Sequence, residues 1–185
     1  MPAIQGEAGV LVLINHQSVL DIPLVVAALP IHLRIVTRGR YASGKLIISH
    51  MGRLYQYPVV EPTATVPGRL RSIGGAAQDS SVPIVLYPEG TRTRDGLLES
   101  WSEGELRVIL GAWQWTVKLI VADGLWQTDR LTDFVNKVSS IDSRSVVVGP
   151  FVSPEPGTDP EPFIAFMRVR MKAVFTGLHS EELER

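Results

Sequence analysis

The chain has 185 residues, a length typical of one domain, and we expect residues 1–185 to fold as a single unit. Apolar residues make up 45% and charged residues 20%, a balance typical of globular proteins and not of disordered ones. The net charge of −1 argues against a nucleic-acid partner, and the absence of cysteine excludes disulfides, thiolate metal sites and cysteine nucleophiles. No stretch reaches the roughly 18 apolar residues of a membrane span and no signal peptide is visible, so the expected location is cytoplasmic.

The first half of the chain alternates short apolar runs with helix-like stretches. Residues 9–14 are apolar and mostly branched, which predicts a buried strand, and residues 19–29 follow as a helix with Pro23 in its first turn. We predict further strands over 32–37, 57–60 and 83–87, helices over 45–51 and 70–79, and a loop over 61–68.

The second half continues the alternation, with a helix predicted over 104–115, strands over 118–122 and 145–148, a loop over 153–160 and a helix over 161–178. Strands that alternate with helices predict an α/β domain with a mainly parallel central sheet flanked by helices. The apolar face of the last helix is predicted to consist of Phe163, Phe166, Met167, Val169 and Val174.

His16 directly follows the first predicted strand, at the end where open α/β sheets bind their ligands. A tight turn would let the Asp21 carboxylate reach one imidazole nitrogen and leave the other nitrogen outward as a general base. This would be the His–Asp half of a catalytic triad, with the hydroxyl supplied by the substrate. The alternative is a helix cap or a core pair, which the spacing taken alone favours.

A second polar segment, residues 87–94, also follows a predicted buried strand and should lie at the same edge of the sheet. The Arg92 guanidinium offers a fork of donors that matches phosphate, and Gly90 permits a tight turn. The alternative is a polar loop with solvated arginines, which this segment taken alone favours.

Together the two segments resemble the glycerolipid acyltransferase family of 1-acylglycerol-3-phosphate acyltransferases, whose hallmarks are a His-x4-Asp block and a Glu-Gly-Thr-Arg block. The matching segments here are residues 15–21, Asn-His-Gln-Ser-Val-Leu-Asp, and residues 89–92, Glu-Gly-Thr-Arg. The resemblance covers roughly residues 9–125. It includes a loop with an aromatic residue and a glycine, Trp101 and Gly104, and a basic position that Arg38, Arg40 or Lys45 could fill.

Three features depart from the family pattern. Residues 117–121 lack the prolines of the family's fourth block, and residues 60–62 lack the arginine expected after the third strand. The chain also begins shortly before His16, so the family's N-terminal helical segment is expected to be absent. Either the chain is truncated or its membrane docking is built differently.

The resemblance implies transfer of a fatty acyl group from acyl-CoA or acyl-carrier protein to the hydroxyl of a lysophospholipid such as 1-acylglycerol-3-phosphate, without cofactor or metal. His16 would be the base and Asp21 would orient it. The implied partners include the cytoplasmic face of a membrane and no nucleic acid. The implied substrate-binding residues are Asn15, Ser18, Arg40, Lys45, Glu89, Gly90, Thr91 and Arg92.

Within that set, Glu89 would either orient Arg92 or accept a hydrogen bond from the acceptor hydroxyl. The alternative function is a non-catalytic or altered-specificity lipid- or acyl-binding domain of the same fold. A serine hydrolase or a nucleotide-binding domain is disfavoured because no Gly-x-Ser-x-Gly, Walker or Gly-x-Gly-x-x-Gly sequence is present.

Several other residues have two readings. An apolar acyl groove could form from residues 22–29 and 47–54 or from Trp113, Trp115 and Trp126, although ordinary core packing is the favoured reading of the tryptophans. His32, His50 and His179 are isolated in the sequence and are expected to be structural or at the surface. A basic run without acidic residues is equally compatible with a solvated surface and with anion binding: Arg34, Arg38, Arg40, Lys45 and Arg53.

Overall fold

The computed structural model describes residues 9–18, 21–22, 25, 33–38, 59–60, 67–68, 73, 75, 82–126 and 143–183. The strands are β1 (Val10–Ile14), β2 (Arg34–Ile35), β3 (Thr37–Arg38), β4 (Val59–Val60), β5 (Ile84–Leu86), β6 (Thr116–Asp123) and β7 (Arg144–Val152). The helices with described bounds are α5 (Glu103–Ala112) and α7 (Glu161–Leu183), and the described residues 21–22, 25, 67–68, 73 and 75 are also helical. The helix predicted over 45–51 lies outside the described residues.

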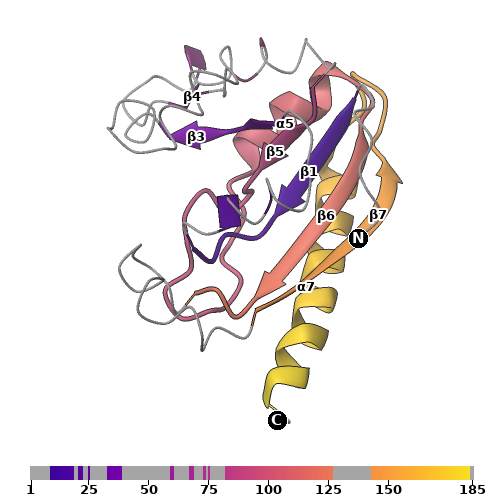
Figure 1. Ribbon diagram of the computed structural model, residues 1–185. Helices are drawn as coiled ribbons and strands as arrows, with labels where there is room; N and C mark the ends of the chain where they lie inside the picture. Colours follow the sequence, from indigo (N-terminus) through magenta and orange to yellow (C-terminus); the bar gives the residue numbers. More distant parts are fainter. Residues whose placement is uncertain are drawn as a thin grey trace.

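A five-stranded sheet in the order β2-β5-β1-β6-β7 forms the centre of the domain (Figure 1). β1 pairs in parallel with β5 and β6, β2 pairs in parallel with β5, and β7 pairs antiparallel with β6. β3 and β4 pair in parallel as a separate two-stranded sheet. The predicted α/β class with a mainly parallel sheet is confirmed.

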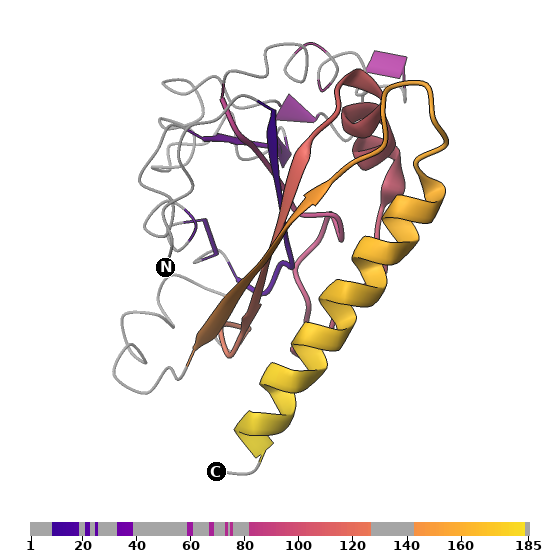
Figure 2. The ribbon, with the colours of Figure 1, turned by 90° about the vertical axis from the view of Figure 1, so that its right-hand side faces the viewer.

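Both faces of the sheet are covered, which explains why β1 is apolar at every position. Leu11 and Leu13 face a core that includes residues of α5 and α7, whereas Val10, Val12 and Ile14 face a second core on the other side. Figure 2 shows α5 and α7 on the same side of the sheet. Burying both faces requires a continuous apolar run in place of alternation.

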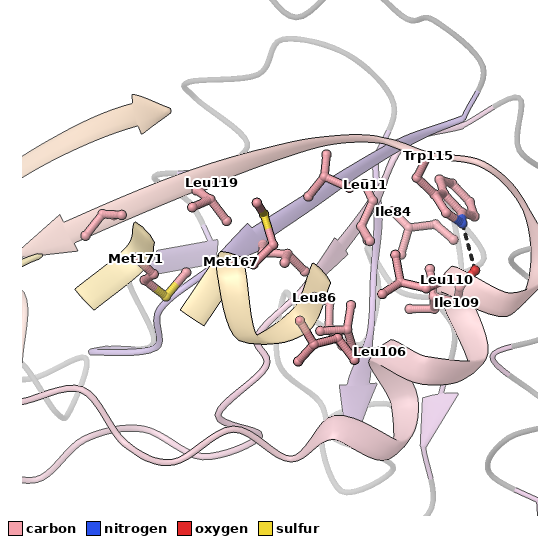
Figure 3. Packing of buried hydrophobic residues seen from close by; sticks show 14 of the residues in the cluster. Leu11, Ile84, Leu86, Leu106, Ile109, Leu110, Trp115, Leu119, Met167 and Met171 are labelled. Carbon is pink, nitrogen blue, oxygen red and sulfur yellow. Dashed lines mark hydrogen bonds between the residues drawn. The ribbon is translucent and has the colours of Figure 1, made fainter. Parts of the chain in front are cut away.

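Trp115 belongs to the larger core and lies at one end of the cluster drawn in Figure 3. Its side chain is 0% exposed, and its indole Nε1 donates a hydrogen bond of 2.7 Å to the carbonyl oxygen of Ile109 in α5. Met167 and Met171 of α7 belong to the same cluster. The reading of Trp115 as a groove residue is therefore wrong, and the alternative reading as core is confirmed for this tryptophan.

The apolar face predicted for the last helix is partly wrong. Phe166 and Val169 are 45% and 65% exposed, although Met167 is buried as predicted. The buried residues of α7 recur every three or four positions, as expected for one face of a helix. Because apolar residues also lie on the exposed side of α7, hydrophobicity alone did not identify the buried face. This buried stripe consists of Ile164, Met167, Met171, Phe175 and Leu178.

Other differences concern boundaries. The strand predicted over 32–37 is divided into β2 and β3, which belong to different sheets. Residues 67–68 are helical and not part of a loop, and Gly104 lies inside α5. α5 ends at Ala112, before the predicted residue 115, because Trp113 has an extended backbone. Within the described part of the chain, no helix combines the length and the hydrophobicity needed to cross a bilayer.

Candidate active site

The two motif segments leave the sheet side by side. β1 and β5 are parallel neighbours with Leu13 opposite Leu86, so the residues after each strand lie at the same edge of the sheet. The backbone N–H of Thr93 donates to the carbonyl oxygen of His16 at 2.9 Å, which joins the second segment to the first. We call this region, residues 15–18, 87–97 and 123–126, the carboxyl edge.

His16 and Asp21 form a hydrogen-bonded pair at this edge. The distance from His16 Nδ1 to Asp21 Oδ2 is 2.8 Å, and the same oxygen accepts hydrogen bonds from the backbone N–H groups of Gln17 (2.7 Å) and Ser18 (2.9 Å). Asp21 is fully buried, whereas the His16 side chain is 19% exposed. A carboxylate held by two peptide N–H groups has a fixed position, so it orients the imidazole and leaves Nε2 as the available nitrogen.

The imidazole of His16 is also held on its face. The ring of Tyr87 lies 4.2 Å from the His16 ring, centroid to centroid, and is tilted by 33°. The ring contact and the carboxylate act in different directions, so together they restrict both the position and the rotation of the ring. A base for proton transfer requires such a restricted orientation.

Glu89 has a role that the sequence did not indicate. Its Oε1 accepts a hydrogen bond from the backbone N–H of His16 at 3.4 Å, and its Oε2 accepts one from the N–H of Glu99 at 3.3 Å. The side chain is buried, and this burial raises the pKa of Glu89 from 4.5 to about 8. The buried carboxyl of Glu89, in the second motif segment, therefore holds the backbone of His16 in position through this hydrogen bond. The predicted contacts of Glu89 with Arg92 or an acceptor hydroxyl stay predictions.

The raised pKa of Glu89 makes stability depend on pH. Between pH 4.5 and about 8 the folded chain keeps a proton on Glu89 that the unfolded chain releases, so the free energy of unfolding falls as pH rises through this range. Glu89→Gln removes this dependence. As pH rises from about 5 to 8, we therefore expect the wild type to lose on the order of a few kcal/mol of unfolding free energy relative to Glu89→Gln.

Urea unfolding of the wild type and Glu89→Gln at several pH values, followed by circular dichroism, measures this shift. Glu155→Gln is the control, because Glu155 is an exposed carboxylate in the loop before α7 and should leave the pH trend unchanged. Parallel pH profiles for the wild type and Glu89→Gln would show that Glu89 is ionised in the folded protein.

The other predicted site residues are placed as follows. Asn15 is buried, and its side-chain amide exchanges two hydrogen bonds of 2.8 Å with the backbone of Ala122, which extends the pairing of β1 with β6. Gly90 has a φ of +64° and donates its N–H to Tyr87, so it forms the turn out of β5. Thr91 is exposed and Arg92 is half-buried. Their contacts with substrate, and that of Asn15, stay predictions.

Ser18 is buried beside Asp21, and Arg40 and Lys45 lie outside the described residues. Among the residues that the structure describes, no three His, Cys, Asp or Glu side chains are grouped so that they could hold a metal ion.

The chain is similar to known proteins in both sequence and fold. A family model described as Acyltransferase matches residues 2–121, which include both motif segments. A search of curated proteins found no match. Among solved structures, the fold is similar to that of the 1-acyl-sn-glycerophosphate (LPA) acyltransferase PlsC from Thermotoga maritima, with a TM-score of 0.73 and 18% sequence identity over 95% of this chain and 68% of that chain. Because the family model matches more than half of the sequence, the chain belongs to the Acyltransferase family and is an acyltransferase.

Proposed function

We propose that the enzyme transfers a fatty acyl group from a thioester, either acyl-CoA or acyl-carrier protein, to the free hydroxyl of a lysophospholipid such as 1-acylglycerol-3-phosphate. The observation that carries the proposal is the pair of His16 and Asp21, 2.8 Å apart at the carboxyl edge and hydrogen-bonded to the segment that contains Arg92. A general base and a cation suited to phosphate would then belong to two segments that meet at the same edge of the sheet, which supports the proposal. The name of the similar Thermotoga enzyme supports the same acceptor class.

In the proposed mechanism, His16 Nε2 removes the proton of the acceptor hydroxyl while its oxygen attacks the thioester carbonyl. Asp21 keeps the imidazole in position and stabilises the imidazolium that forms. The tetrahedral intermediate then collapses, the carbon–sulfur bond breaks, and the departing thiolate takes the proton from His16. Positioned base catalysis of this kind contributes about 10²- to 10⁴-fold. The scheme uses no cofactor or metal because a thioester is already an activated acyl donor.

We propose that Arg92 binds the phosphate of the acceptor. It lies between the Gly90 turn and Thr93, whose N–H is bonded to His16, so its guanidinium extends from a segment tied to the base. Gly90, Thr91, Ser18 and Asn15 would complete the acceptor site, and Arg40 and Lys45 remain further candidates for anion contacts. A lysophospholipid resides in a membrane, so we propose that the enzyme acts at the cytoplasmic membrane face.

Turnover measured with a panel of acceptors tests the proposal. Purified protein is mixed with long-chain acyl-CoA or acyl-carrier protein and with several lysophospholipids, and release of free thiol is followed. We expect turnover with a phosphorylated lysolipid. Binding of acyl donor and lysolipid without turnover would instead support the non-catalytic lipid-binding alternative.

Replacing Arg92 by alanine tests the phosphate contact. Charged hydrogen bonds contribute about 1.5–3 kcal/mol, so Arg92→Ala should raise KM for a phosphorylated acceptor by about 10- to 100-fold with a smaller effect on kcat. A neutral monoacylglycerol should be affected much less. Arg94→Ala is the matched control, because Arg94 is an exposed arginine in the same segment. An equal rise in KM for the neutral acceptor would contradict the role of Arg92.

A further inference from the structure

A second pair of a histidine and a carboxylate lies at the carboxyl edge. His179, near the end of α7, contacts Asp123 at the end of β6, with 2.9 Å between Nδ1 and Oδ2. The ring of Phe175 stacks on the His179 imidazole at 5.6 Å between centroids. Figures 1 and 2 both show α7 passing beside the end of β6. The expectation that His179 is merely structural or at the surface therefore overlooked a specific partner.

Gln17 connects this second pair to the first. Its side-chain Nε2 donates to Asp123 Oδ1 at 3.1 Å and to the carbonyl oxygen of Gly96 at 3.2 Å, and its Oε1 accepts from the N–H of Leu125 at 3.0 Å. The side chain is buried. Both ends of its amide are therefore fixed by buried partners from the two other segments of the carboxyl edge, residues 87–97 and 123–126.

The backbone of the same residue holds the proposed catalytic carboxylate. The N–H of Gln17 donates the 2.7 Å hydrogen bond to Asp21 Oδ2, the oxygen that His16 Nδ1 contacts. His16 and Gln17 are consecutive, but their side chains have different partners. His16 lies against Tyr87 of the second core, whereas Gln17 contacts Asp123, which in turn contacts His179 of α7. A shift of the Gln17 side chain would thus rotate the peptide group that orients Asp21.

We propose that Gln17 and Asp123 are positioning residues, which hold the His16–Asp21 pair in its reactive geometry through the peptide N–H of Gln17, and that His179 of α7 fixes the Asp123 carboxylate. The inference rests on the proposed role of His16. The last helix, distant in sequence from both motif segments, therefore helps to position the base.

Steady-state kinetics of Gln17→Ala and Asp123→Ala test the proposal. A misplacement of catalytic groups by about 1 Å can cost about 10²-fold, so we expect kcat to fall by about 10- to 100-fold while KM for donor and acceptor changes little. Asp123→Asn should recover much of the loss seen in Asp123→Ala, because an asparagine oxygen can still accept from Gln17 and from the N–H of Gly124. Ser180→Ala, an exposed position next to His179, is the matched control and should keep full activity.

A spectroscopic measurement separates this proposal from the proposed function. The hydrogen-bonded Nδ1 proton of His16 should give a downfield proton resonance, assigned by its loss in His16→Ala, and it should weaken in Gln17→Ala and persist in Ser180→Ala. This readout does not require turnover, so an inactive wild type would contradict the acyl-transfer proposal alone. A Gln17→Ala variant with kcat within about twofold of wild type and an unchanged His16 resonance would overturn the positioning role. If Gln17→Ala does not fold, Asp123→Asn and Asp123→Ala decide the question in the same way.

Discussion

Replacing His16 by alanine is expected to lower kcat for acyl transfer by on the order of 10³-fold. The variant has no group at this position that can take the acceptor proton. The thioester and the remaining binding contacts are unchanged, so KM for both substrates should stay near the wild-type value. Release of free thiol from acyl-CoA in the presence of lysophospholipid measures the effect.

The fold should survive this substitution. The side chain of His16 is partly exposed, and Asp21 keeps its hydrogen bonds to the N–H groups of Gln17 and Ser18. Thermal unfolding by circular dichroism checks this point. Added imidazole should restore part of the turnover of His16→Ala, because it can occupy the vacated space and act as the base. Turnover that persists at the wild-type rate in His16→Ala would remove His16 from the mechanism.

The fold class and the edge of the sheet that carries the site were predictable from sequence. β1 and β5 are buried on both faces, so each is a continuous apolar run that a strand prediction detects. Because the carboxyl ends of parallel strands meet at one edge, the segments after β1 and β5 were expected to meet, and the bond from Thr93 to His16 shows that they do.

The supporting contacts could not be predicted, because they depend on register and helix length. Glu89 reaches the backbone of His16 only because Leu13 lies opposite Leu86 in the parallel pairing of β1 and β5. Nothing in the sequence of residues 87–94 fixes that register. A carboxylate directly after a buried strand was a possible signal, but its partner is a peptide N–H, which no residue pattern reveals.

His179 illustrates the effect of helix length. The predicted last helix ended at residue 178, one residue too early to include it, whereas α7 continues to Leu183. Nothing in the polar residues after Leu178 breaks a helix, so α7 continues past the last residue of its buried stripe. Only the packing of α7 against the sheet brings His179 to Asp123 at the end of β6.

Replacing Asp21 by asparagine is expected to lower kcat by about 10²- to 10⁴-fold without removing the base itself. In Asp21 the Oδ2 atom accepts from His16 Nδ1 and from two peptide N–H groups, so the oxygen of an asparagine should take that position. The hydrogen bond to the neutral imidazole then remains possible, but the negative charge that stabilises the imidazolium is lost. The asparagine NH₂ would replace Oδ1, which has no hydrogen-bond partner among the described residues. A buried unpaired donor costs about 1–3 kcal/mol, so a modest loss of stability should accompany the loss of activity.

Asp159→Asn is the matched control for the charge of Asp21. Asp159 is exposed, and its carboxylate accepts a hydrogen bond from the N–H of Glu161 at the start of α7, as an asparagine would. Both substitutions keep an oxygen that accepts from the backbone, but only Asp21 also faces a histidine. A loss of kcat in Asp21→Asn alone would therefore assign the effect to the charge next to His16. Full activity in both variants would mean that His16 and Asp21 form only a helix cap or a core pair, which is the reading that their spacing favours when taken alone.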